Sequence, residues 1–387
     1  MGLFFLLCFF IAFMESVYPA NSSKNIKLYV AIVFFIFAIL IGLRNPSVGD
    51  DTSVYIRNFN LVRKYESLSK IASNSRFEIG YLFYVKLLTL ITDDPQILLV
   101  VTAVFVSYAF GRFIYRYSNN PMLSILMFLT LDYFDTCMSS VRISMAIAFL
   151  LFAYDGLFER NLLKTLFFTL AAASMHYTAI VFLVLYPITA KRRGIWFHLI
   201  SVAIVIVLSM TFNRVVQFVG SYLPQYTHYF ENSTTGYTAG ATLAIGLMIV
   251  LWLAMYLFST LGIKLFSTEK VNPCKYIKQR EIEEDSADLR PCNTCADQVD
   301  NVCRAAVWMG VLALLLALNG TMLARFKYIF SASILLLFPN SIIQISNDSN
   351  QKFFLLGSAL LFVAYTIVIV VFRPTWSSTY PYSFFWQ

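Results

Sequence analysis

Apolar runs long enough to form helices recur from one end of the 387-residue chain to the other. Because hydrocarbon offers the backbone no hydrogen-bond partners, a helix is the only element of these lengths that can span a bilayer, and it needs about 20 largely apolar residues. The sequence therefore predicts an all-α, polytopic integral membrane bundle of about 11–13 transmembrane helices. The runs lie near 2–18, 27–43, 79–91, 96–115, 121–134, 141–158, 161–175, 177–190, 195–212, 239–266, 305–320, 324–340 and 353–372.

Composition excludes a soluble protein. Hydrophobic residues make up 59% of the chain and charged residues 13%, which is more apolar surface than a soluble domain can bury. The first run lacks the basic stretch of a signal peptide and the next run follows almost at once, so it is expected to be a retained helix. We expect one membrane domain over 1–387. The formal net charge of +8 is explained by loop residues that anchor the protein to the membrane, and no nucleic-acid partner is expected.

The run at 79–91 is expected not to cross the membrane. It is short, and the turn-forming cluster at 92–95 (Thr-Asp-Asp-Pro) follows it, which hydrocarbon would not tolerate. We predict a re-entrant or interfacial helix there. The stretch 161–190 is expected to form two short helices that meet near His176, which places this histidine at a turn.

Four short loops carry basic residues, which are typical of cytoplasmic loops. They are Lys24/Lys27, Arg112/Arg116, Arg160/Lys164 and Lys191/Arg192/Arg193. With these loops inside, the connections 44–78, 135–142, around 176, 213–238 and 319–325 face outward. The basic residues within 44–78 argue against this orientation, but four short loops outweigh one long loop. The tyrosine-rich segment 213–238 suits either glycan contact or the membrane interface, and the cysteine-containing segment 267–304 is expected to be a cytoplasmic loop.

Six charged or titratable residues at the ends of apolar runs fall on the outward face in this orientation. Such a set suggests an active site for a substrate with an anionic group and hydroxyls, because arginine binds anions bidentately and stays protonated. Any one arginine, taken alone, is equally well explained as an interfacial anchor. The six residues are Arg44, Asp51, Glu78, Arg142, His176 and Arg325.

A hydroxyl nucleophile needs a general base within hydrogen-bond reach. Glu78 and His176 both qualify by residue type and the choice between them stays open, with Asp51 as a third candidate. Alternatively, Glu78 caps its helix, His176 satisfies backbone groups at its turn, and Asp51 pairs with Arg44 or Arg57.

Five segments together resemble the EpsG family of membrane proteins, which is grouped with Wzy-type polysaccharide polymerases. The first, IGLRNPSVGDDTSVY at 41–55, is similar to the family's R-x-x-x-V-G-x-D-T-x-x-Y opening. The others follow in order up to about residue 340. They are EIGY at 78–81, VRISMA at 141–146, ASMHYTA at 173–179 and RFKY at 325–328. Ile143 stands where the family usually has glutamine, so a hydrogen bond from that position is not expected here.

The resemblance implies a glycosyltransferase that polymerises oligosaccharide repeat units carried on polyprenyl diphosphate. It would act at the outer face of the cytoplasmic membrane, for surface polysaccharide such as capsule, exopolysaccharide or O-antigen. Arg44, Arg142 and Arg325 would then hold the diphosphate, and Tyr55 and Tyr81 would contact the substrate. Chain-length regulators and export-pathway proteins are expected partners. No cofactor and no metal ion are expected, because the three histidines are scattered and Asp50-Asp51 is only a weak acidic pair.

Three alternatives remain open at this stage. A lipid-linked oligosaccharide flippase should line a central cavity with its charges and show internal repeats. An O-antigen ligase-like enzyme shares the donor chemistry, and an acyltransferase that decorates the glycan would need a cytoplasmic donor site.

The cysteines of 267–304 form either a zinc site or a loop of reduced thiols. They are Cys274, Cys292, Cys295 and Cys303.

Overall fold

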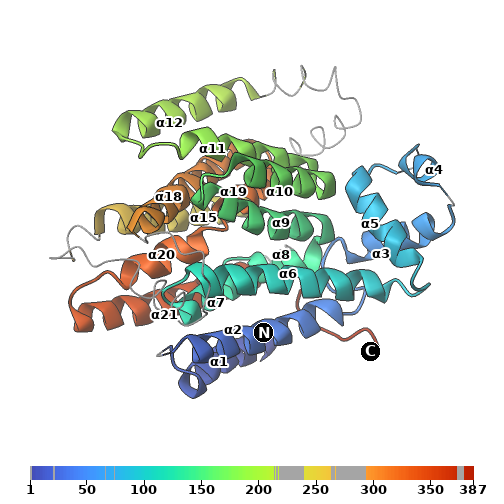
Figure 1. Ribbon diagram of the computed structural model, residues 1–387, viewed down its shortest axis with the longest axis horizontal. Coiled ribbons are helices and arrows are strands. Elements are labelled where there is room, and N and C mark those ends of the chain that lie inside the picture. Colours follow the sequence, from blue (N-terminus) through green and yellow to red (C-terminus); the bar gives the residue numbers. More distant parts are fainter. Residues whose placement is uncertain are drawn as a thin grey trace.

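The computed structural model describes residues 2–20, 22–65, 67–73, 75–212, 239–262, 293–372 and 379–387, with 214, 217 and 266 as single positions. This part of the chain is a bundle of helices (Figure 1). Its only β pairing is an isolated antiparallel bridge between Arg44 and Phe384. The all-α prediction is confirmed.

The first half of the bundle runs to the turn after helix α10. Its helices are α1 (Gly2–Val17), α2 (Ser23–Gly42), α3 (Thr52–Arg63), α4 (Leu68–Ser73), α5 (Ile79–Thr89), α6 (Gln96–Tyr117), α7 (Pro121–Thr130), α8 (Tyr133–Ser139), α9 (Val141–Phe158) and α10 (Leu162–Met175). Side-chain caps fix several starts: Ser22 accepts from the Asn25 amide, and Asn120 precedes Pro121 at the first position of α7.

The second half contains more interruptions. Its elements are η1 (Tyr177–Val184), α11 (Leu185–Ile188), α12 (Ile195–Met210), α15 (Ala239–Leu257), η3 (Phe258–Gly262), α18 (Asn293–Leu316), η4 (Ala317–Asn319), η5 (Thr321–Arg325), α19 (Phe326–Ser331), α20 (Ile334–Ile342) and α21 (Asp348–Phe372).

Within the described residues, six helices are long and apolar enough to cross a membrane, and the bent pair α7 and α8 makes a seventh if it is one span. Five shorter apolar helices accompany them. The protein is therefore a multi-pass membrane bundle. Helix α5 has 11 residues and is about 16 Å long, roughly half the thickness of a hydrocarbon core, so it is too short to cross alone. The predicted loop 44–78 contains α3 and α4, while most of 213–238 lies outside the described residues.

Many of the charged residues lie at one of two opposite ends of the bundle. At one end, Gln96 of α6 donates to the Gly42 carbonyl of α2 (2.6 Å), and α9 begins and α10 ends there. At the other, Ser23 and Tyr115 are hydrogen-bonded (3.1 Å), and Arg160 donates to Thr189 (3.1 Å). We name these the site end and the basic end, because the four basic loops all lie at the second.

The bundle has a large aromatic core and a smaller second core. Phe34, Phe37, Phe110 and Phe128 from α2, α6 and α7 pack with ring centroids 4.7–5.5 Å apart. The second core joins α3, α5 and the first turns of α6 and α9. Helices α3 to α5 gather at one end of the bundle, where the C-terminus also lies (Figure 1).

Candidate active site

Three helix ends meet around Glu78. This residue immediately precedes α5, Arg142 is the second residue of α9, and His176 follows the last residue of α10. Arg142 donates through Nη1 to one carboxylate oxygen of Glu78, and His176 Nδ1 lies 3.2 Å from the other. The Tyr177 amide donates to that second oxygen (3.3 Å). The sequence pattern thus placed His176 correctly at a turn.

Gly80 allows these helix ends to approach. A Cβ atom at position 80 would lie 2.4 Å from Oγ of Ser174 and 2.7 Å from the Ser174 carbonyl oxygen. Any larger residue would therefore push α5 away from α10 and separate Glu78 from His176.

Glu78 is held as a carboxylate. Its side chain is 6% exposed, and burial raises its pKa, but the hydrogen bond with His176 and the positive charge of Arg142 outweigh burial and lower the pKa to about 2. Such an acidic group is a poor proton acceptor near neutral pH. The position of the Glu78 carboxylate instead suits orienting the His176 ring through its contact with Nδ1. The other ring nitrogen, Nε2, makes no hydrogen bond within the described part of the chain.

Aromatic rings pack against Arg142 and against one another. Its guanidinium lies 4.4 Å from the ring centre of Phe77. Phe77 packs edge-on against Tyr81 (5.4 Å), and Tyr81 packs against Tyr55 (5.8 Å). Tyr55 and Tyr81 are both buried in the second core. The structure therefore places these two tyrosines behind the site, where they fix the arginine, and not at a surface that a glycan could contact.

Asp51 and Arg325 form a second pair next to the first. Arg325 Nη2 lies 3.9 Å from Asp51 Oδ2, and their side chains are 40% and 36% exposed. Ser140 donates to the same oxygen (3.1 Å) and is two residues before Arg142. This pair is thus adjacent to the Glu78 cluster and open to a ligand.

Arg44 occupies a different environment from the other candidates. It is only 1% exposed, donates to the Ile41 carbonyl, and lies 3.4 Å from Thr52 Oγ1. The neighbouring backbone is tied to the C-terminal segment, where Phe385 donates to the Leu43 carbonyl (2.9 Å). Burial lowers the pKa of Arg44 to about 10, so it stays charged at neutral pH. Its position suits joining α2, α3 and the C-terminus.

Sequence reasoning missed one polar cluster. Lys327 Nζ lies 3.3 Å from Asp132 Oδ2, and the Tyr328 hydroxyl donates to the same oxygen. Asp132 has a left-handed backbone (φ 71°) at the 49° bend between α7 and α8. The available signal was a charged residue inside each of two apolar runs, since charges at membrane depth are usually functional or paired.

No group of three or more potential metal ligands occurs among the described residues. Of the four cysteines considered for zinc, Cys303 of α18 is buried in the main core and Cys295 lies in the first turn of α18, whereas Cys274 and Cys292 lie outside the described residues.

A family model matches almost the whole chain. The chain belongs to the EpsG family. The match covers residues 27–384 and includes every residue of the site. This family is associated with Wzy-type polymerases, which supports a membrane polysaccharide polymerase-like role in general terms. Neither a curated protein nor a solved structure matches the chain.

Proposed function

We propose that this EpsG protein is a membrane glycosyltransferase that joins polyprenyl-diphosphate-linked oligosaccharide repeat units at the outer face of the cytoplasmic membrane. The observation that carries the proposal is the contact of Glu78 with both Arg142 and His176. It combines a cation, an oriented imidazole and a fixed carboxylate where three helices end. The site end would face outward, because the basic loops lie at the other end.

His176 is the proposed general base. Glu78 orients the ring through Nδ1, so Nε2 is the nitrogen that takes the proton from the acceptor hydroxyl. The hydroxyl oxygen bonds to the anomeric carbon of the donor as the bond from that carbon to the diphosphate oxygen breaks. The product is a longer glycan and a free polyprenyl diphosphate.

The leaving group is a multiply charged anion, which arginine suits best. Arg325 is 40% exposed and Arg142, 16% exposed, is the cation of the adjacent pair, so these two are the proposed diphosphate ligands. Preorganised cations of this kind contribute several kcal/mol to lowering a barrier.

The mechanism requires no metal ion, so polymerisation by the purified protein is expected to continue in EDTA. A loss of activity in EDTA that Mg²⁺ restores would contradict this mechanism.

One observation favours transport as a second candidate. Asp132 and Lys327 pair where the α7–α8 helix is broken, and broken helices with charges at the break are typical of secondary transporters. A lipid-linked oligosaccharide flippase remains the alternative function.

The test is glycan chain length in cells that lack their own copy of the protein. Complementation with wild type, His176→Gln or Arg325→Ala is compared at matched membrane abundance. We expect wild type to restore long chains and both variants to leave single lipid-linked units on the outer leaflet. The control is Glu159→Gln, which alters an exposed carboxylate at the basic end and should give normal chains. Units trapped on the inner leaflet would support transport, and normal chains from both site variants would refute the proposed site.

A regulator of chain length and the proteins of an export pathway are proposed as partners. A polymer made at the outer surface has to be released or passed on to other proteins. Co-purification from cross-linked membranes, with a chain of unrelated fold as the control, is the direct test.

A further inference from the structure

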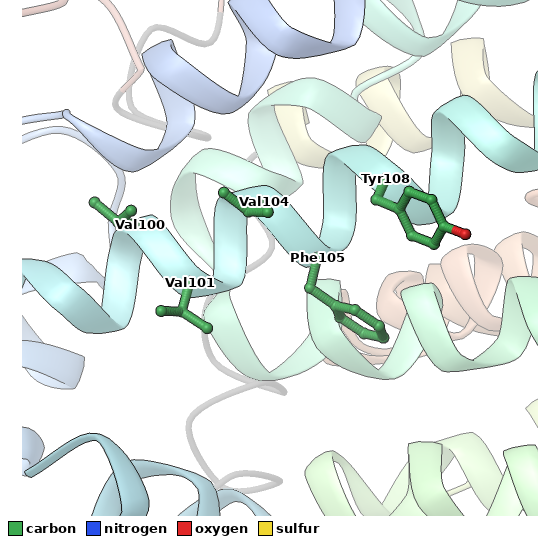
Figure 2. Close-up of a pocket in the computed structure, with 5 residues that line it drawn as sticks. All are labelled: Val100, Val101, Val104, Phe105 and Tyr108. Atoms are coloured by element: carbon green, nitrogen blue, oxygen red, sulfur yellow. The ribbon is translucent and has the colours of Figure 1, made fainter. Parts of the chain in front are cut away.

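An apolar groove with a volume of about 340 Å³ follows one face of α6. Val100, Val101, Val104, Phe105 and Tyr108 line it, and Figure 2 shows these side chains in sequence along the helix. Val104 and Tyr108 are largely exposed. The groove is therefore open from the side of the bundle that faces the membrane.

The groove leads toward the basic end. Phe105 packs against Phe152 of α9, with ring centroids 6.2 Å apart, and Tyr108 packs against the same ring at 6.5 Å. The Arg112 guanidinium lies 4.9 Å from the centre of that Phe152 ring. One aromatic ring thus connects the apolar groove with a cation one helical turn beyond Tyr108.

Arg112 belongs to a cluster around a buried carboxylate. Asp155 of α9 accepts from Arg112 (2.6 Å) and from the Tyr117 hydroxyl (2.7 Å). Arg116 and Lys164 approach the same carboxylate less closely, at 3.7 and 4.0 Å. The basic residues were expected to be topology signals only, but the structure gathers them around one acid.

The cluster carries more positive than negative charge. Lys164 also pairs with the exposed Glu159 (2.8 Å), whereas Arg160 donates to the Tyr186 carbonyl and the Thr189 hydroxyl. Three basic side chains, Arg112, Arg116 and Lys164, therefore face the two carboxylates Asp155 and Glu159. Arg116, with its side chain 45% exposed, is only loosely paired and remains able to bind an anion.

The dimensions suit a lipid. Twelve residues separate Val100 from Arg112, which is about 18 Å along a helix, a little more than one leaflet of a roughly 30 Å hydrocarbon core. An acyl chain in the groove would place its phosphate beside Arg112, Arg116 and Lys164. A polyprenyl chain that enters from the proposed site would put its phosphates at the opposite end, away from these cations.

We propose that α6, α9 and α10 form a binding site for an anionic phospholipid of the leaflet at the basic end. One acyl chain lies along the groove on α6, and the headgroup phosphate binds Arg116 and Lys164 beside Arg112. Basic pockets between transmembrane helices commonly bind anionic headgroups in this way. The site is independent of the proposed glycosyltransferase chemistry.

The experiment measures lipid retention on the full-length protein in nanodiscs of phosphatidylcholine with a minor fraction of phosphatidylglycerol. Native mass spectrometry then counts the bound lipids of each class. Wild type is expected to retain phosphatidylglycerol in preference to phosphatidylcholine. Since each basic residue near an anionic phosphate contributes roughly a fivefold change in affinity, Arg116→Gln with Lys164→Gln should weaken retention by roughly 25-fold.

Two further variants test the groove and the specificity of the effect. Val104→Trp fills the groove and should reduce retention, whereas Leu199→Trp, on the exposed face of α12, should not. Lys191→Gln removes a cation from the same end but outside the cluster and should also have no effect. Equal retention of both lipids by wild type, or unchanged retention by the double variant, would overturn the proposal. Displacement of phosphatidylglycerol by an added polyprenyl phosphate would assign the groove to the substrate instead.

Discussion

Replacement of Glu78 by glutamine tests the charge arrangement of the site directly. Glutamine keeps the shape of the protonated acid but cannot become an anion. The pKa of Glu78 falls from its ordinary value of 4.5 to about 2, a difference that corresponds to at most about 3 kcal/mol of folding stability. Because the folded pKa is depressed, this stabilisation is complete above about pH 4.5 and is lost as the pH falls toward 2. Glu78→Gln should therefore lower the free energy of unfolding at neutral pH by up to about 3 kcal/mol.

The measurement is unfolding of wild type and variant in mixed detergent micelles across a pH series. The difference between the two proteins should be largest near neutral pH, shrink below pH 4.5 and nearly vanish near pH 2. Glu159→Gln serves as the control, since its exposed pair with Lys164 is worth less than about 1 kcal/mol. Equal stability of wild type and Glu78→Gln at neutral pH, or a difference that persists unchanged at low pH, would refute the reasoning.

Three further predictions concern the neighbouring residues. Gly80→Ala should lower the free energy of unfolding by about 1–3 kcal/mol and shorten the glycan, because its Cβ would lie 2.4 Å from the Ser174 hydroxyl. Addition of Ser174→Gly should recover part of the stability. A Gly80→Ala protein as stable as wild type would count against the close approach of the two helices. Arg325→Ala should change stability by less than about 1 kcal/mol yet abolish long chains, so long chains from a stable Arg325→Ala protein would remove Arg325 from the leaving-group role. Lys327→Met should destabilise the protein by about 1–3 kcal/mol, because it removes the cation from Asp132 while that carboxylate is partly exposed and keeps the Tyr328 hydroxyl. Asp132→Asn in the same chain should restore most of that loss, as thermal unfolding of both proteins would show.

The class of fold could be predicted from the sequence because each apolar run is a local property of the chain. The breaks within the runs could not. The run at 121–134 reads as one span, yet the helix bends by 49° at Asp132, and no proline marks that position. Asp132 at the bend contacts Lys327 and Tyr328, which lie almost 200 positions away and which no local pattern connects to it.

Which residues form the site could be predicted only in part. Loop charges indicated which helix ends share a face, and this brought Glu78, Arg142 and His176 into one group. Burial could not be predicted, because an arginine at the end of an apolar run looks the same whether it reaches water or is enclosed. Arg44 is enclosed because the C-terminal segment, through Phe384, pairs with its backbone, and that contact joins opposite ends of the sequence.

The two ion pairs of the site suit different tasks. Arg142 is bound to a buried carboxylate and packed on Phe77, so separating it from Glu78 would strand a charge in a poorly hydrated place at a cost of several kcal/mol. Arg325 meets Asp51 at 3.9 Å with both groups over a third exposed, a contact worth at most about 1 kcal/mol. A diphosphate that binds the site can therefore displace Asp51 from Arg325 at little free-energy cost. Arg142, in contrast, stays paired with Glu78 and has to interact with the substrate without moving. It follows that substitutions of Arg325 should weaken diphosphate binding and the leaving-group step with little change in stability, while substitutions of Arg142 should act on the structure of the site and the reaction together.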